Sequence, residues 1–196
     1  MLYGLIAEDR KILSAGQVLI ARISQETTAR IEPRVLNGKP AFVADAWRVV
    51  KEFCHRFPDM HKILAVCDAD HDDAEELEAA LIGKILRRCG PIPMPLLCHV
   101  IKIELETWWM ADVDTISRVV GGVIPYPGGN AETIRDPKEI LIRRLRDAGC
   151  GPYTDAKARA FAEHLDFGVA EARAPGFGVF RQKVENGVTR GQAIVQ

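Results

Sequence analysis

The chain has 196 residues, of which 47% are hydrophobic and 27% charged, with 26 Lys and Arg against 27 Asp and Glu. This length predicts one domain, or one domain with a modest extension. The formal net charge of −1 excludes a protein that coats nucleic acid by charge alone. The apolar fraction is too high for a disordered chain, and the apolar runs end before the ~20 residues that a transmembrane helix needs.

Two further features of composition point to the cytoplasm. Residues 1–7 form an apolar run with no basic residues ahead of it, so we expect a strand there rather than a signal peptide. The five cysteines are scattered and show no C-x-x-C spacing. This pattern argues against a disulfide framework or a zinc ribbon and favours a reducing compartment.

The first part of the chain alternates strand and helix patterns. Short apolar runs predict strands, and apolar residues at helical spacing predict helices. The expected strands cover 2–7, 30–36, 62–67 and 96–103, and the expected helices cover 9–24, 42–53 (stopped by Pro58), 72–90 and 105–119. Since these helices are long enough for crossovers between parallel strands, the order predicts an α/β fold: a three-layer sandwich with a mostly parallel sheet.

A loop rich in proline and glycine, residues 124–130, marks a predicted boundary. We expect an α/β core over 1–123 and a helical C-terminal extension, packed on the core, over 124–196. In the sequence Asp136-Pro137-Lys138-Glu139 we expect an N-cap, proline at the first helical position and glutamate at the third. Further helices are expected from Thr154 and near Phe177, and a loosely held tail after Asn186.

The most informative stretch is acidic. Asp68 and Asp70 follow the most apolar predicted strand, and a spacing of two points both side chains to the same side. The carboxyl ends of strands are where ligands bind in an open α/β sheet. The acids that follow, from Asp72 onward, are explained well as a helix N-terminus and a solvated helix face.

Glu8 follows the first predicted strand in the same way. If the first and third strands are neighbours, Glu8, Asp68 and Asp70 converge at one edge of the sheet. Carboxylates without a nearby Cys or His pair form an oxygen site for a hard cation, Mg²⁺ or Mn²⁺, rather than zinc.

Two other kinds of site with an acidic loop, an EF-hand calcium site and a phosphatase active site, match the sequence around Asp68 less well. An EF-hand loop starting at Asp68 would need Gly at position 73 and Glu at position 79, where this chain has Asp73 and Ala79. A haloacid-dehalogenase-type phosphatase also carries D-x-D after a strand, with the first Asp as nucleophile. Such enzymes usually carry it on the first strand and follow it with Thr or Val, but the phosphatase remains an alternative.

A second stretch, 103–112, carries paired tryptophans beside acids. It is either a core helix with an acidic outer face, or it provides Glu106 as a further metal ligand or a partner for a lysine. Asp112 lies six residues on, so the same helix cannot direct both acids to one ion. Between 133 and 159 basic residues outnumber acids, and of these we single out Lys138 and Lys157 as contacts for a phosphodiester.

These stretches together resemble the DUF4276 family, a group of bacterial proteins related to the TOPRIM superfamily. The resemblance is carried by Glu8, by Asp68-Ala69-Asp70, by Glu106-Thr107-Trp108-Trp109-Met110-Ala111-Asp112, by Asp136-Pro137-Lys138-Glu139, by Tyr153 with Lys157, and by Ala174-Pro175-Gly176-Phe177-Gly178-Val179-Phe180. It implies a TOPRIM-like core with an acidic, Mg²⁺-binding centre. One departure is Asp9, where relatives usually have Gly after the first Glu; this residue either restricts the approach of a phosphate or adds a ligand.

We therefore expect a metal-dependent nuclease that acts on DNA or RNA. The expected ligands of Mg²⁺ or Mn²⁺ are Glu8, Asp68 and Asp70, with Asp72 and Glu106 as further candidates, and Lys138 or Lys157 would neutralise charge on the phosphate. The resemblance also implies an ATPase partner and a role in defence against phage. The alternative from another class is a non-catalytic α/β adaptor or regulatory partner of an ATPase, and a homodimer is compatible with either.

Overall fold

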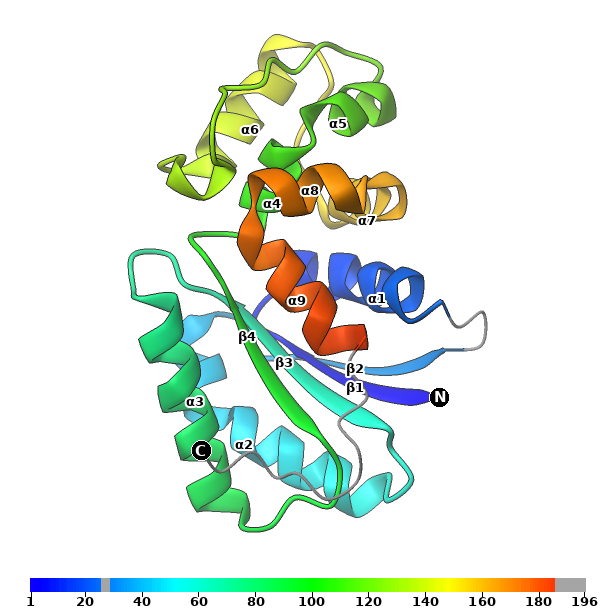
Figure 1. Ribbon diagram of the computed structural model, residues 1–196, viewed down its shortest axis with the longest axis vertical. Coiled ribbons are helices and arrows are strands. Elements are labelled where there is room, and N and C mark those ends of the chain that lie inside the picture. The colour runs from blue at the N-terminus through cyan, green and yellow to red at the C-terminus, as the bar shows by residue number, and fades with distance from the viewer. Residues whose placement is uncertain (26–28, 186–196) are drawn as a thin grey trace.

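The computed structural model describes residues 1–25 and 29–185, and its centre is a four-stranded sheet (Figure 1). The sheet has the order β2-β1-β3-β4, and all its strands are parallel. The strands are β1 (Leu2–Ala7), β2 (Arg30–Val35), β3 (Lys62–Asp68) and β4 (Leu96–Ile101). The predicted α/β class with a parallel sheet is confirmed, and β1 and β3 are neighbours as the site prediction requires.

Helices cover both faces of this sheet. The side chains of each strand alternate between two apolar cores, with Leu5 and Leu64 on one side and Ile6 and Ile63 on the other. α1 (Arg10–Ser24) packs on the first side, and α2 (Lys39–Arg56) and α3 (Ala74–Cys89) pack on the second (Figure 1). These are the three layers that the sequence predicts.

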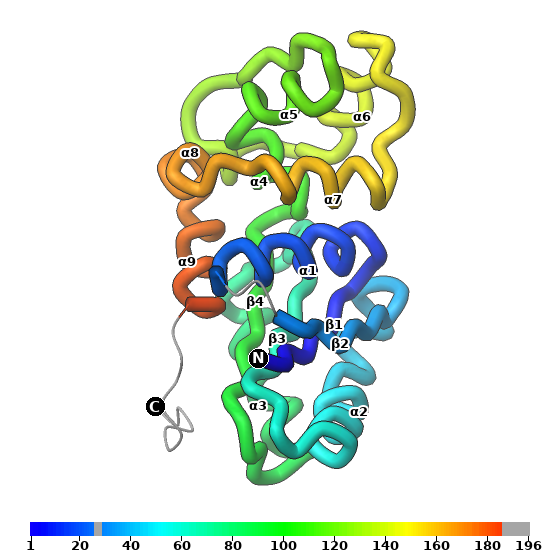
Figure 2. Tube along the Cα trace, turned by 90° about the vertical axis from the view of Figure 1, so that its right-hand side faces the viewer, coloured from blue at the N-terminus to red at the C-terminus, as the bar shows by residue number. Residues whose placement is uncertain are grey.

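Most of the remaining helices form a stack beyond the carboxyl ends of the strands. Figure 2 shows α7 lying above α1, with α5 and α6 further from the sheet. α9 alone runs back along the sheet, on the same side as α1 (Figure 1). The elements that follow β4 in the described residues are α4 (Glu106–Ala111), α5 (Val113–Val120), the 3-10 turn η1 (Ala131–Thr133), α6 (Pro137–Asp147), α7 (Asp155–His164), α8 (Phe167–Arg173) and α9 (Pro175–Glu185).

The apolar core under α1 continues into this stack without interruption. The stack begins at α4, before the predicted boundary at residue 124, and the division at that residue stays a prediction. The predicted loose tail lies outside the described residues. In the two ranges 1–25 and 29–185, no helix combines the length and the apolar character that crossing a membrane would take.

The expected helix over 105–119 is two helices, broken at Asp112. The Asp112 carboxylate accepts from the backbone N–H of Thr115 (3.2 Å) and so caps α5. Its other oxygen accepts from the backbone N–H of Asp166 (2.8 Å), at the start of α8. One buried carboxylate thus caps α5 and ties its start to the start of α8, while the backbone N–H of the same residue donates to the carbonyl of Trp109 at the end of α4.

The start of α6 also differs from the expectation. The helix begins at Pro137, as predicted, but Asp136 has a left-handed backbone (φ 50°) and makes no capping hydrogen bond. Instead, Glu104 reaches from the loop after β4 and accepts from the backbone N–H of Lys138 (3.1 Å). The cap therefore comes from a residue far away in the sequence, and it fixes α6 over the end of the sheet.

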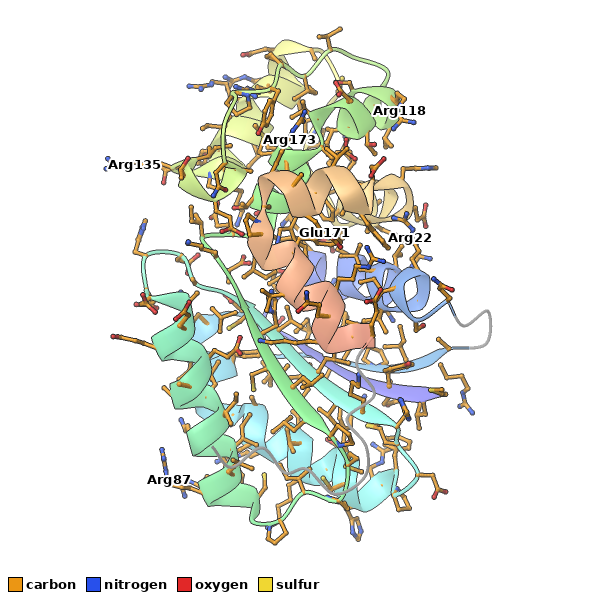
Figure 3. All side chains as sticks on the ribbon, in the orientation of Figure 1. Arg22, Arg87, Arg118, Arg135, Glu171 and Arg173 are labelled. Atoms are coloured by element: carbon orange, nitrogen blue, oxygen red, sulfur yellow. The ribbon has the colours of Figure 1, made fainter. Side chains whose placement is uncertain are left out.

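Arg22 joins α1 to the helical stack (Figure 3). Its guanidinium donates to the carbonyls of Ala162 (2.6 Å) and Leu165 (3.0 Å), at the end of α7, and lies over the ring of Phe167 (4.2 Å). A cation at a helix C-terminus satisfies carbonyls that have no partner within the helix. This contact holds the stack in place above α1.

Lys62, at the start of β3, binds the end of α9. Its side chain is buried, and its ammonium donates to the carbonyls of Lys183 (3.0 Å) and Val184 (2.8 Å) in the last turn of α9. Burial lowers the pKa of Lys62 to about 8. The start of β3 and the end of α9 are thereby joined by a charged group inside the fold.

An ion pair covers the open edge of β4. Lys183 on α9 pairs with Glu78 on α3, and its ammonium also donates to the carbonyl of Cys98 (2.8 Å). The Glu78 carboxylate accepts from the backbone N–H of Val100 (3.2 Å). Because exposed strand edges invite pairing with another chain, this arrangement protects the edge while it fixes α9.

The buried His99, on β4, should make the stability of the fold depend on pH. It is buried against Trp108 and Phe180, and in the described part of the chain neither ring nitrogen has a hydrogen-bond partner. Burial, and then the charge of Lys183, lower its pKa to about 3. At pH values below about 6.5, the ordinary pKa of histidine, His99 binds a proton in the unfolded protein but stays neutral in the folded protein.

The free energy of unfolding should therefore fall as the pH drops from about 6.5 toward 3. The His99→Leu variant should lose this component, at most roughly 1.4 kcal/mol per pH unit. Urea unfolding at several pH values measures it, with His55→Gln, an exposed histidine at the end of α2, as the control. Parallel curves for wild type and His99→Leu would contradict the account.

Candidate functional site

Acidic side chains meet at the carboxyl edge of the sheet, between β1 and β3. Glu8 follows β1 directly, and Asp68 is the last residue of β3. The backbone N–H of Asp68 donates to a carboxylate oxygen of Glu8 (3.0 Å), and the backbone N–H of Glu8 donates to the carbonyl of Val66 (3.1 Å). The parallel pairing of these two strands therefore brings Glu8 to Asp68, as the sequence predicts.

Asp68 is the most unusual of these acids. It is 9% exposed, and within residues 1–25 and 29–185 its buried Oδ1 atom has no hydrogen-bond partner. Burial raises its pKa well above the ordinary value, and the charges of Glu106, Glu8, Asp9 and Asp70 raise it further. A buried, unpartnered carboxylate surrounded by other acids destabilises the folded state unless a proton or a cation relieves it.

Glu106 lies across from Asp68 at the start of α4. It is only 2% exposed, because α4 begins as soon as the chain leaves the sheet and turns under the helical stack. Burial raises the pKa of Glu106 to about 7, although its own backbone N–H and the charge of Lys138 lower it. The structure thus places the candidate ligand Glu106 with Asp68.

Two neighbouring acids have structural partners. Asp9 caps α1, since its side chain accepts from the backbone N–H of Ile12 (2.8 Å). Glu8 is half-buried, and burial raises its pKa; the hydrogen bond from Asp68 lowers it, the charge of Asp70 raises it, and the charge of Lys39 lowers it. Asp9, in the position where the resembled family has glycine, therefore serves α1 and adds negative charge beside Asp68.

Asp70 and Asp72 are both paired with one lysine, Lys39. β3 ends at Asp68 and Asp70 has a left-handed backbone (φ 50°), so the alternation that the sequence prediction used no longer applies. The Asp70 carboxylate lies 2.7 Å from the ammonium of Lys39, and that of Asp72 lies 3.2 Å from it. The structure therefore places Glu8 and Glu106 beside Asp68, whereas Asp70 and Asp72 share Lys39 and form a second group, whose Asp70 charge still acts on Asp68 and Glu8.

The two predicted lysines have different positions. Lys138, in the first turn of α6, faces the acids: burial lowers its pKa, but the charges of Glu106, Glu104, Asp68 and Asp9 outweigh burial and raise it. Lys157 lies on α7, and its ammonium donates to the carbonyl of Pro152 (2.7 Å). The structure thus brings Lys138 to Glu106 but directs Lys157 to the loop before α7.

Backbone strain is concentrated beside the site. Ile103 has a left-handed backbone (φ 66°), a conformation that a β-branched residue rarely adopts and that costs on the order of 1–3 kcal/mol. Its carbonyl accepts from the backbone N–H of Asp70 (2.7 Å). The loops after β3 and β4 thus fix each other in strained conformations next to Asp68 and Glu106.

Sequence reasoning missed a buried hydrogen bond behind Glu106. The indole N–H of Trp109 donates to the hydroxyl of Tyr153 (2.8 Å). Burial raises the pKa of Tyr153 well above its ordinary value, and the nearby Glu106 raises it further. Glu106 and Trp109 lie three residues apart on α4, so their side chains share one face of the helix. This spacing was the available signal that a single side chain, here Tyr153, could contact both.

The residue types fit a hard cation, but in the described ranges no three His, Cys, Asp or Glu side chains are grouped so that they could hold a metal as they stand. Asp68 Oδ1 and Glu106 offer carboxylate oxygens, the donors that Mg²⁺ and Mn²⁺ prefer. A third carboxylate requires a side chain to rotate. Glu8 can do so by releasing the hydrogen bond that it accepts from Asp68.

Comparisons with family models, with curated protein sequences and with solved structures found no match to this chain.

The state of Asp68 leads to a prediction about stability in chelated buffer. Because its pKa is raised in the folded protein, the native state binds more protons than the unfolded state, and stability falls as the pH rises above about 3.9. Asn cannot ionise, and its amide can donate to Glu8 or Glu106. Asp68→Asn should therefore raise the free energy of unfolding at pH 8 by about 1–2 kcal/mol, the pattern of a residue kept for function.

Urea unfolding in the presence of a chelator measures this effect. Asp59→Asn, a substitution of an exposed aspartate before β3, provides the control and should change little. A loss of stability for Asp68→Asn across the whole pH range would show that the Asp68 carboxylate has a favourable partner in the folded protein.

Proposed function

We propose that this protein is a metal-dependent nuclease that hydrolyses phosphodiester bonds of DNA or RNA with Mg²⁺ or Mn²⁺. The observation that supports the proposal best is the buried, unpartnered Oδ1 of Asp68 beside two further carboxylates. One divalent cation relieves the repulsion among all three acids at once, whereas a proton relieves it at one.

The cation would be held by Asp68 and Glu106, with Glu8 as the side chain that rotates to join them. Bound there, it would supply a polarised water molecule and neutralise charge on the phosphate oxygens. The site lies at the carboxyl ends of β1 and β3, which is where open α/β sheets bind ligands.

Lysines around the acids favour a phosphate substrate. Lys138 extends from the first turn of α6 toward Glu106, and its positive charge is available to a phosphate oxygen once the acids have bound a cation. Lys39 provides a second positive charge next to Glu8. Behind the acids, Trp109 and Tyr153 form a buried wall that excludes water from the inner side of the site.

The resemblance to the TOPRIM-related DUF4276 family belongs to this proposal. Glu8 directly after β1 and Asp68 at the end of the neighbouring β3 are compatible with it. An ATPase partner and a role in phage defence are proposed on the same ground, and a cytoplasmic location on the scattered cysteines without C-x-x-C spacing.

The test is a cleavage assay on plasmid, linear duplex, single-stranded DNA and RNA, with Mg²⁺ or Mn²⁺ and with chelator. We expect metal-dependent cleavage by wild type, and at least a roughly hundredfold loss of rate in Asp68→Asn and in Glu106→Gln. Glu75→Gln, on the exposed face of α3, is the matched control and should cleave like wild type.

Cleavage that survives both site variants would refute the proposed site. If the folded protein cleaves no nucleic acid under any of these conditions, the non-catalytic adaptor becomes the better explanation. A small phosphomonoester in the same assay tests the phosphatase alternative, which predicts turnover that Asp68→Asn abolishes.

A further inference from the structure

Lys39 occupies a position that resembles that of a bound cation. It is the first residue of α2, and its side chain extends over the loop after β3. Its ammonium lies 2.6 Å from the carbonyl oxygen of Ala69, 2.7 Å from a carboxylate oxygen of Asp70 and 3.2 Å from one of Asp72. An ammonium has three N–H donors, so these three oxygens satisfy it fully.

The local chain geometry fixes Lys39 in this place. β2 is followed by a turn in which Gly38 has φ 108°, a backbone conformation that favours glycine. The N–H of Gly38 donates to the carbonyl of Glu8 (2.9 Å), so the start of α2 is tied to the end of β1. Only 17% of the Lys39 side chain is exposed, compared with 45% for Asp70 and 60% for Asp72.

The acids at the carboxyl edge of the sheet therefore form two groups that differ in charge compensation. Asp70 and Asp72 have a built-in cation, and the charge of Lys39 also acts on Glu8. Among the residues that the structure describes, Asp68 forms no ion pair with a cation, and its buried Oδ1 has no hydrogen-bond partner. Uncompensated charge that a divalent ion can relieve is thus found at Asp68 and not at Asp70.

We propose that Lys39 is a fixed second cation of this site: its ammonium takes the place that a second divalent ion would occupy among Ala69, Asp70 and Asp72, so the protein binds one divalent ion, at Asp68. This inference rests on the proposed function and specifies the number of ions that the site uses. A tethered ammonium is present at a high effective concentration, and Mg²⁺ loses its water reluctantly, so the ammonium holds the oxygens against the free ion.

The test counts bound Mn²⁺ by titration calorimetry and by electron paramagnetic resonance, without substrate. Wild type should bind one ion per chain, and Lys39→Met should bind one more, because the three oxygens lose their cation. Lys84→Met is the matched control: the Lys84 ammonium donates to the carbonyl of Val43 (2.7 Å), and this variant should bind as many ions as wild type.

Lys39→Gln keeps the inference testable if Lys39→Met unfolds, because its neutral amide can still donate hydrogen bonds but no longer balances the charge of Asp70 and Asp72; it too should bind one ion more than wild type. Lys39→Met with Asp70→Asn, which removes the cation together with one carboxylate, should return the ion count to that of wild type. Equal counts in wild type and a folded Lys39→Met or Lys39→Gln, or two ions in wild type, would overturn the inference. Wild type without any bound Mn²⁺ refutes the proposed function, whereas the increase of one ion in Lys39→Met tests Lys39 independently of it.

Discussion

The candidate site is dominated by the electrostatic repulsion between carboxylates that the fold holds close to one another. The parallel pairing of β1 and β3 places Glu8 against the backbone of Asp68, and the short connection from β4 to α4 brings Glu106 opposite. The three groups are partly or fully buried, and each has a raised pKa. Such a cluster costs stability, so its presence indicates a role that a less charged edge would not serve.

The rest of the molecule supports the position of these acids. Glu104 caps α6 and so directs Lys138 toward them, while Arg22 fixes α7 above α1. At the other end, Lys62 and Lys183 hold α9 along the sheet. Each of these contacts pairs a charged side chain with backbone groups of a distant element, and this explains how a stack of short helices is held firmly over the end of a four-stranded sheet.

Much of the fold could be predicted from local pattern. Short apolar runs gave β1 and β3 correctly, and the residues after each strand gave Glu8 and Asp68, because neighbouring parallel strands end at one edge. Burial and alternation also explain why Cys98 and His99 face opposite cores.

What could not be predicted depends on contacts between distant parts of the chain. The expected pairing of Asp68 with Asp70 assumed that the strand continues, whereas the left-handed Asp70 lies beyond its end and pairs with Lys39. The N-cap expected of Asp136 is provided by Glu104, and Asp112 breaks a helix that the apolar pattern alone would continue. In each case a side chain from another element decides the local structure.

The central claim is that the charge at Asp68 is relieved by a single divalent ion. The most direct measurement is anomalous diffraction from a crystal soaked with Mn²⁺. We expect one peak within coordination distance of Asp68 Oδ1, between Glu106 and Glu8, with Lys39 still bound to Asp70. The absence of a peak there, or peaks only at the exposed acids of α3, would contradict the account.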